Sequence, residues 1–124
     1  MRHSIGIRGI LFHGDDRPSD VVQFVAASRI TVEDCVFLTS KGRHVLLWEA
    51  FDCRFHNTDF EWGRTAGSGI PMIELRSGDG MENANQVHFV GCRCESYPGT
   101  AIALTGNNTN EIFFTNCELA AASA

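Results

Sequence analysis

A nine-residue pattern recurs five times along this chain and constrains its fold more than any other feature. The copies are SIGIRGILF (4–12), RITVEDCVF (29–37), DCRFHNTDF (52–60), QVHFVGCRC (86–94) and EIFFTNCEL (111–119). The second and fourth positions are apolar in every copy, and the seventh and ninth are mostly apolar. The sixth is Gly, Asp or Asn, residues that tolerate left-handed or tight-turn backbone. Each copy therefore predicts a short strand, a sharp corner and a second short strand.

A shorter apolar pattern lies between the copies and predicts a third strand in each repeat. It reads VQF (22–24), VLL (45–47), IEL (73–75) and IAL (102–104). The second positions of successive nine-residue copies are 23 to 34 residues apart, a period typical of stacked solenoids. Strands that recur once per turn must run parallel and in register, about 4.8 Å apart. We expect an all-β parallel β-helix of about five short turns with three strands per turn, and almost no helix.

The signature I-x-I-x-N-C-x-F, followed by a short V-x-L strand, resembles the right-handed parallel β-helix of pectate lyase-like and phage tailspike-like proteins. The resemblance covers about residues 4–119. It implies the fold but no activity, because that superfamily contains lyases, hydrolases, epimerases and non-catalytic adhesins. It also implies an Asn ladder at one corner, where this chain has Asp34, Asn57 and Asn116, interrupted by Gly9 and Gly91.

Composition predicts a single domain over residues 1–124, because 44% of the residues are hydrophobic and 20% are charged. A net charge of −5 argues against a nucleic-acid partner, which would require clustered Lys and Arg. The sequence contains no run of 18 apolar residues, so it predicts no membrane-spanning helix. No signal peptide is visible, so we expect a cytoplasmic protein if the chain is complete and a surface or virion protein if it is a fragment.

The five cysteines fall at pattern positions that otherwise hold apolar residues, which predicts thiols that act as small core side chains. They are Cys35, Cys53, Cys92, Cys94 and Cys117. Two alternatives stay open. A disulfide between Cys92 and Cys117 would join adjacent turns, and metal binding at Cys92-x-Cys94 would need a second ligand pair that the spacing does not supply.

The third turn is the longest, and its additional residues, 61–71 and 76–85, flank the strand at 73–75. In pectate lyase-like proteins the corresponding loops build the saccharide cleft, so the resemblance places the candidate site here. Alternation predicts that Glu74 points outward, because its neighbours Ile73 and Leu75 are core positions. An aromatic ring can cover the apolar face of a sugar while charged groups orient its hydroxyls or carboxylates. The candidate ligand-binding residues are Trp48, Trp62, Arg76, His44 and Arg64.

Candidate catalytic residues are the carboxylates Glu74, Asp79 and Glu82. Glycoside hydrolysis needs two carboxyl groups, about 5–5.5 Å apart for retention or 6.5–9.5 Å apart for inversion. Glu74 with Asp79 or Glu82 could form such a pair, and so could Asp59 with Glu61. A calcium-dependent lyase would need several outward aspartates on the third strand, whereas that column reads Gln23, Leu46, Glu74 and Ala103. We expect no cofactor and no metal site; the alternative is calcium in the loop at 77–83, which has enough oxygen ligands for it.

The last copy of the pattern would present Ile112, Phe114 and Leu119 at an open strand edge. We therefore expect a homo-oligomer, or a part of a longer β-helix, formed through exposed end coils. For function, the sequence favours a non-catalytic glycan-binding or adhesive module whose partner is an oligo- or polysaccharide. The alternatives are a structural or oligomerisation unit without a ligand, and a polysaccharide hydrolase, lyase or epimerase.

Overall fold

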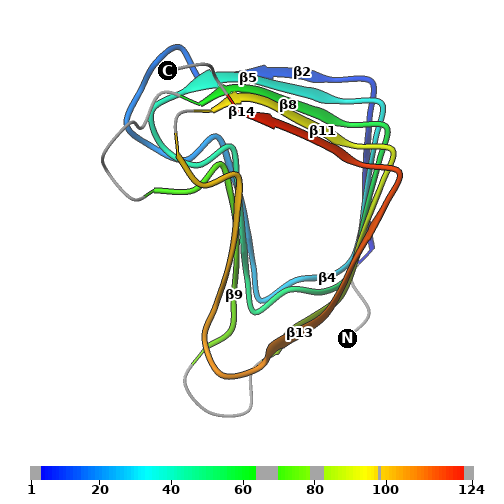
Figure 1. Ribbon diagram of the computed structural model, residues 1–124. Helices are drawn as coiled ribbons and strands as arrows, with labels where there is room; N and C mark the ends of the chain where they lie inside the picture. Colours follow the sequence, from blue (N-terminus) through cyan, green and yellow to red (C-terminus); the bar gives the residue numbers. More distant parts are fainter. Residues whose placement is uncertain (1–3, 64–69, 79–82, 98, 122–124) are drawn as a thin grey trace.

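The computed structural model is a right-handed parallel β-solenoid with three sheets around one core (Figure 1). It describes residues 4–63, 70–78, 83–97 and 99–121. These ranges contain strands, turns and bends but no helix, as the repeat pattern predicts. Each turn of the chain adds one strand to each sheet in succession, and Figure 1 looks along the solenoid axis.

The strands of each sheet pair in parallel with their equivalents in the turns before and after. Sheet A contains β1 (Ile5–Arg8), β4 (Ser28–Glu33), β7 (Phe51–His56), β10 (Ala84–Val90) and β13 (Thr109–Thr115). Sheet B contains β2 (Leu11–His13), β5 (Val36–Ser40), β8 (Asp59–Gly63), β11 (Arg93–Tyr97) and β14 (Glu118–Ala121). Sheet C contains β3 (Val22–Val25), β6 (Val45–Trp48), β9 (Ile73–Arg76) and β12 (Ile102–Thr105). Four of the expected turns are thus complete, and the described part of the fifth contributes to sheets A and B.

The core consists of columns of inward side chains that repeat the apolar positions of the pattern. Ile30 pairs with Cys53 and Val32 with Phe55 between β4 and β7, and all four side chains are fully buried. Phenylalanine rings stack along the columns, with 5.0 Å between the ring centroids of Phe55 and Phe89. Because the interior is filled by stacked equivalents, the apolar pattern and the register determine each other.

The corner between sheets A and B has the backbone conformation that the sixth pattern position predicts. Asp34, Asn57 and Asn116 have φ of 53°, 45° and 52°, in the left-handed region that Asn, Asp and Gly tolerate best. Backbone hydrogen bonds connect corners of successive turns, such as Asn57 N–H to the Val90 carbonyl at 2.9 Å. A Cβ at Gly91 would lie 2.8 Å from Asn57 Oδ1, so glycine leaves room for the Asn57 side chain.

All five cysteines are free, and four are buried while Cys117 is partly exposed. The prediction that the thiols act as core side chains is confirmed for the four buried cysteines, and the alternative Cys92–Cys117 disulfide is wrong. The thiols also act as hydrogen-bond donors at the corner. Cys92 Sγ donates to the Phe55 carbonyl and Cys117 Sγ to the Phe89 carbonyl, both at 3.3 Å. Each of these bonds joins one turn to the preceding turn.

We predict that Cys117 is the one thiol that reacts rapidly with an aromatic disulfide reagent in dilute native protein at pH 8. Burial raises the pKa of Cys53 and Cys94 to about 12 and that of Cys92 to about 11. A pKa of 12 in place of 9 lowers the thiolate fraction at pH 8 about a thousandfold, and Cys35 is 1% exposed. Thiol release should report one rapid equivalent in the native state and five in denaturant. Rapid release of several native equivalents would contradict the prediction.

Candidate functional site

A groove of about 410 Å³ lies on the outer side of sheet C. Residues that come just before β3, β6 and β9 form part of its wall. Four charged side chains contribute to its walls, namely Asp20, Arg43, Glu74 and Arg76. Pro18, Ile70 and Pro71 add apolar surface, and Thr105 adds a hydroxyl. The groove therefore combines a polar floor with apolar patches.

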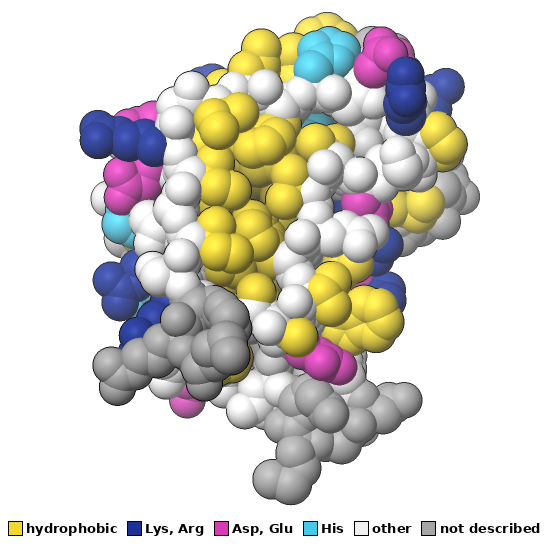
Figure 2. Space-filling model, turned by 180° about the vertical axis from the view of Figure 1, so that it is seen from behind, with side chains coloured by type: hydrophobic (Ala, Val, Ile, Leu, Met, Phe, Trp, Pro, Cys, Tyr) yellow, Lys and Arg dark blue, Asp and Glu magenta, His cyan; other side chains and the backbone are white. Residues whose placement is uncertain are grey.

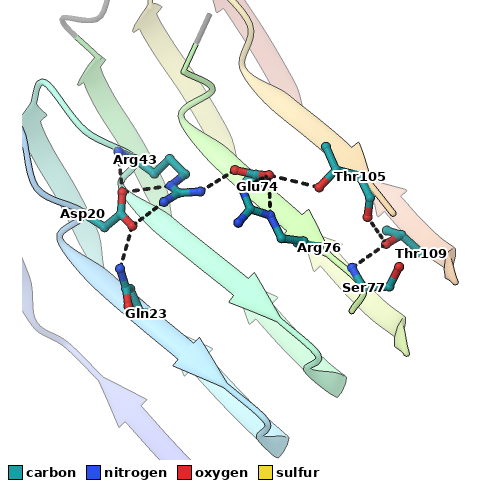
Figure 3. Close-up of polar contacts among 8 residues, drawn as sticks. All are labelled: Asp20, Gln23, Arg43, Glu74, Arg76, Ser77, Thr105 and Thr109. Atoms are coloured by element: carbon teal, nitrogen blue, oxygen red, sulfur yellow. Dashed lines mark hydrogen bonds and ion pairs between the residues drawn. The ribbon is translucent and has the colours of Figure 1, made fainter. Parts of the chain in front are cut away.

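The charged residues of the groove form one continuous hydrogen-bonded chain across the turns (Figure 3), which we call the polar ladder. Asp20 accepts two hydrogen bonds of 2.8 Å from Arg43, from Nε to Oδ1 and from Nη2 to Oδ2. Arg43 Nη1 donates to Glu74 Oε2. Glu74 Oε1 accepts from Arg76 Nε at 3.0 Å, from Arg76 Nη2 at 2.8 Å and from Thr105 Oγ1 at 3.0 Å. The polar ladder thus connects all four complete turns.

In-register stacking explains why these residues meet. Val22 of β3 pairs with Val45 of β6, so Asp20 and Arg43, each two residues before those strands, occupy equivalent positions in successive turns. Glu74 lies on β9 between Ile73 and Leu75, which are fully buried, and it therefore faces outward from the sheet. Its own side chain is 7% exposed, because the arginines cover it.

Glu74 is held in its ionised form. Burial alone would raise the pKa of Glu74, but hydrogen bonds from Arg76, Arg43 and Thr105 outweigh burial and hold that pKa below its ordinary value. Burial would also raise the pKa of Asp20, but hydrogen bonds from Arg43 outweigh burial and lower that pKa. Both carboxylates are therefore charged at neutral pH. A general acid must be protonated at working pH, so Glu74 is poorly suited to protonate a leaving group.

Trp48 and Arg76 form a stacked pair beside the polar ladder. They are register partners on β6 and β9, and the Arg76 guanidinium carbon lies 5.5 Å from the centre of the Trp48 ring. Trp48 is 38% exposed, so part of its ring remains accessible. The contact is of the cation–π type, worth about 0.5–1 kcal/mol at such exposed positions.

Several residues predicted for the site lie elsewhere. His44 is fully buried, and its Nε2 is 2.8 Å from the Glu61 carbonyl oxygen, so it does not reach the groove. Trp62 belongs to β8 of sheet B and is 49% exposed. Arg64, Asp79 and Glu82 lie outside the described residues.

The second carboxylate pair, Asp59 and Glu61, lies on sheet B and shares the arginine of the next turn. Arg93 Nη2 is 3.4 Å from Asp59 Oδ2 and 3.7 Å from Glu61 Oε1. This surface ion pair accounts for both carboxylates without a substrate. In the described part of the chain no group of three or more His, Cys, Asp or Glu side chains is placed to hold a metal ion. Within the same ranges no helix has the length and hydropathy needed to cross a membrane.

Sequence reasoning missed Asp20, Arg43 and Thr105. Asp20 and Arg43 stand two residues before the VQF and VLL patterns, and Thr105 stands two residues after Ala103 in the column of Arg76. Stacking equivalent positions outside the apolar pattern would have placed Asp20 beside Arg43. Their opposite charges are the signal that could have identified the polar ladder.

Searches with this chain find no matching family model, no matching curated protein and no matching solved structure. The parallel β-solenoid itself agrees with the resemblance to β-helical proteins seen in the repeat pattern. Any function must therefore be argued from the groove, the polar ladder and the exposed surfaces.

We predict that His44 makes the protein less stable in acid. Burial lowers the pKa of His44 to about 4, from an ordinary value of 6.5. The unfolded chain therefore binds the proton more readily between pH 6.5 and pH 4, and the free energy of unfolding should fall by about 3 kcal/mol over this interval. Urea denaturation at several pH values measures it. His44→Gln should flatten the profile, whereas His88→Gln on the outer face of sheet A should not; an unchanged slope in His44→Gln would contradict the assignment.

We predict that Glu74→Gln lowers the free energy of unfolding by about 2 kcal/mol, because it removes the carboxylate shared by two guanidinium groups. Glu33→Gln is the matched control. The Glu33 side chain is 39% exposed, and its Oε2 lies 4.0 Å from Arg8 Nε. Loss of this surface ion pair should lower the free energy of unfolding by less than about 0.5 kcal/mol. Equal effects of the two substitutions in urea denaturation would show that the polar ladder does not stabilise the fold.

Proposed function

We propose that this protein is a non-catalytic saccharide-binding or adhesive module with a β-helix of the pectate lyase-like and tailspike-like type. The observation that carries the proposal is the partly exposed Trp48 ring, which stacks on Arg76. Arg76 itself lines the groove of sheet C. A sugar ring has an apolar face that packs on an aromatic side chain and hydroxyls that hydrogen-bond to charged groups. The apolar face of a sugar would pack on Trp48 and Ile70. Its hydroxyls would hydrogen-bond to Arg43, Arg76 and Thr105.

The charge balance of the groove favours a neutral saccharide. Two arginines and two carboxylates line it, so their formal charges cancel. Arg43 is committed to Asp20 and Glu74 by three side-chain hydrogen bonds. A uronate-rich polymer would therefore meet little net positive charge, whereas the hydroxyls of a neutral sugar can use the remaining donors and acceptors.

A binding role is favoured over hydrolysis because Glu74 is ionised and both of its oxygens are already hydrogen-bonded. Inverting and retaining hydrolases alike need one protonated carboxyl group. The side chains of the polar ladder satisfy one another's hydrogen bonds. This also supports the alternative of a structural unit without a ligand. The partly exposed Trp48 ring, stacked on Arg76, is the feature that favours a ligand-binding role.

We expect an array of neutral and uronate-containing oligosaccharides to show binding to neutral members. Trp48→Ala should weaken that binding about tenfold or more, since aromatic stacking on the sugar is lost. Trp62→Ala, which removes a comparably exposed tryptophan from sheet B, should leave affinity unchanged. Titration calorimetry measures both effects in variants with unchanged circular dichroism.

Two outcomes would overturn this proposal. Absence of binding to every saccharide on the array would favour the structural alternative. Release of reducing ends or unsaturated sugars from a bound polysaccharide, lost in Glu74→Gln, would favour the hydrolase or lyase alternative.

A further inference from the structure

The first and last coils of the described structure expose core side chains, because each of them has a neighbouring coil on one side only. In the column of sheet A that begins with Ile5, the middle residues Ile30, Cys53 and Val87 are fully buried, whereas Ile5 is 38% exposed. At the other end Phe114 is 46% exposed, although Phe89, one turn earlier, is 1% exposed. Exposure therefore depends on the position in the stack and not on residue type.

We define the two surfaces by these inward residues. The N-terminal end face consists of Ile5, Ile7, Phe12 and Val22, and the C-terminal end face consists of Leu104, Ile112, Phe114 and Leu119. Figure 2 shows the N-terminal end, where apolar side chains form a strip between atoms of the backbone and of other side chains. Contiguous apolar surface beside open strand edges marks an interaction site. Each of β1, β2, β13 and β14 has one neighbour strand within the described chain.

We propose that the C-terminal end face of one molecule docks on the N-terminal end face of a second copy, continuing the solenoid from one chain into the next. A coil of the same cross-section offers backbone donors and acceptors at the strand spacing along both open edges, and the chain's own first coil is such a coil. Continuing the observed register places Phe114 on the partner's Ile7 and Leu119 on the partner's Phe12. These contacts would repeat the apolar stacking between internal turns.

The rim of the junction is compatible with this pairing. In the continued register, Glu111 would lie over the partner's Ser4, Glu118 over the partner's Leu11, and Thr115 over the partner's Arg8. None of these pairs brings like charges together. Pairing like ends, in contrast, would place strands antiparallel and break the columns of stacked equivalents.

The junction has a defined geometry because the sheets differ in strand number. Among the described residues, sheets A and B have five strands and sheet C has four. A docked copy would continue sheets A and B and leave a slot one strand wide in sheet C above Leu104, which is 51% exposed. The contact is heterologous, since each molecule uses a different surface, and such contacts propagate into open chains unless they close into a ring.

We expect the weight-average mass of the protein in sedimentation experiments to rise with concentration from 13.7 kDa through dimers to longer species. Phe114→Asp and Ile5→Asp should each weaken this association roughly a hundredfold or more, because docking would bury an unpaired carboxylate. An equimolar mixture of the two variants should form a complex of 27.4 kDa, twice 13.7 kDa, because each variant retains one of the two complementary faces. The conservative variants Phe114→Leu and Ile5→Val should associate as the wild type does, and circular dichroism verifies folding.

Other outcomes would overturn the proposal. A wild-type protein that stays at 13.7 kDa up to millimolar concentration has no second copy on its end faces. Dimers formed by either aspartate variant alone would show that like ends pair. Trp48→Ala should leave self-association unchanged, which separates this test from that of saccharide binding. Labelling of Cys117, next to the C-terminal end face, should slow as the wild-type protein associates.

Discussion

In each sheet of this solenoid, paired strand residues lie on their equivalents from the turn before, at the spacing of hydrogen-bonded parallel strands. This in-register stacking determines the other features of the molecule. It builds the core from columns such as Val32, Phe55 and Phe89, and it aligns the left-handed corners at Asp34 and Asn57. A shift of one residue would turn the apolar column outward and the charged column inward. Register and core packing are therefore a single constraint.

The polar ladder is the outer counterpart of the apolar columns. Stacking brings Asp20 to Arg43 and Arg43 to Glu74, and alternating charge makes these contacts attractive. Because Glu74 is 7% exposed in its side chain, its charge requires partners, and three neighbouring side chains supply them. This arrangement lowers the proton affinity of the carboxylate that the sequence presented as a catalytic candidate. The contacts that make Glu74 a good structural anion make it a poor acid.

Strands and core columns could be predicted from the sequence because they depend on a short period and on side-chain polarity. The groove was missed, because Asp20 and Arg43 lie outside the repeated pattern and become neighbours only when the strand register is extended to the residues before each strand. His44 stands one residue before β6, where alternation no longer decides its direction, and it fills the interior beneath the Glu61 carbonyl. The cysteines were recognised as core residues, but their hydrogen bonds to carbonyls of the preceding turn depend on corner geometry that polarity does not encode.

A solenoid has lateral faces and end faces, and side chains on the two have different numbers of stacked neighbours. On the lateral faces the inner turns have neighbours on both sides, so charges such as Arg43 and Glu74 find partners in adjacent turns. At the ends the columns stop, and Ile5 and Phe114 lack the neighbour that buries Val87 and Phe89. No rearrangement of a lateral side chain can remove this exposure, because it arises from the position of these coils at the ends of the described stack. The proposed ligand recognition would therefore use the lateral groove and the proposed assembly the end faces, so different residues would control the two.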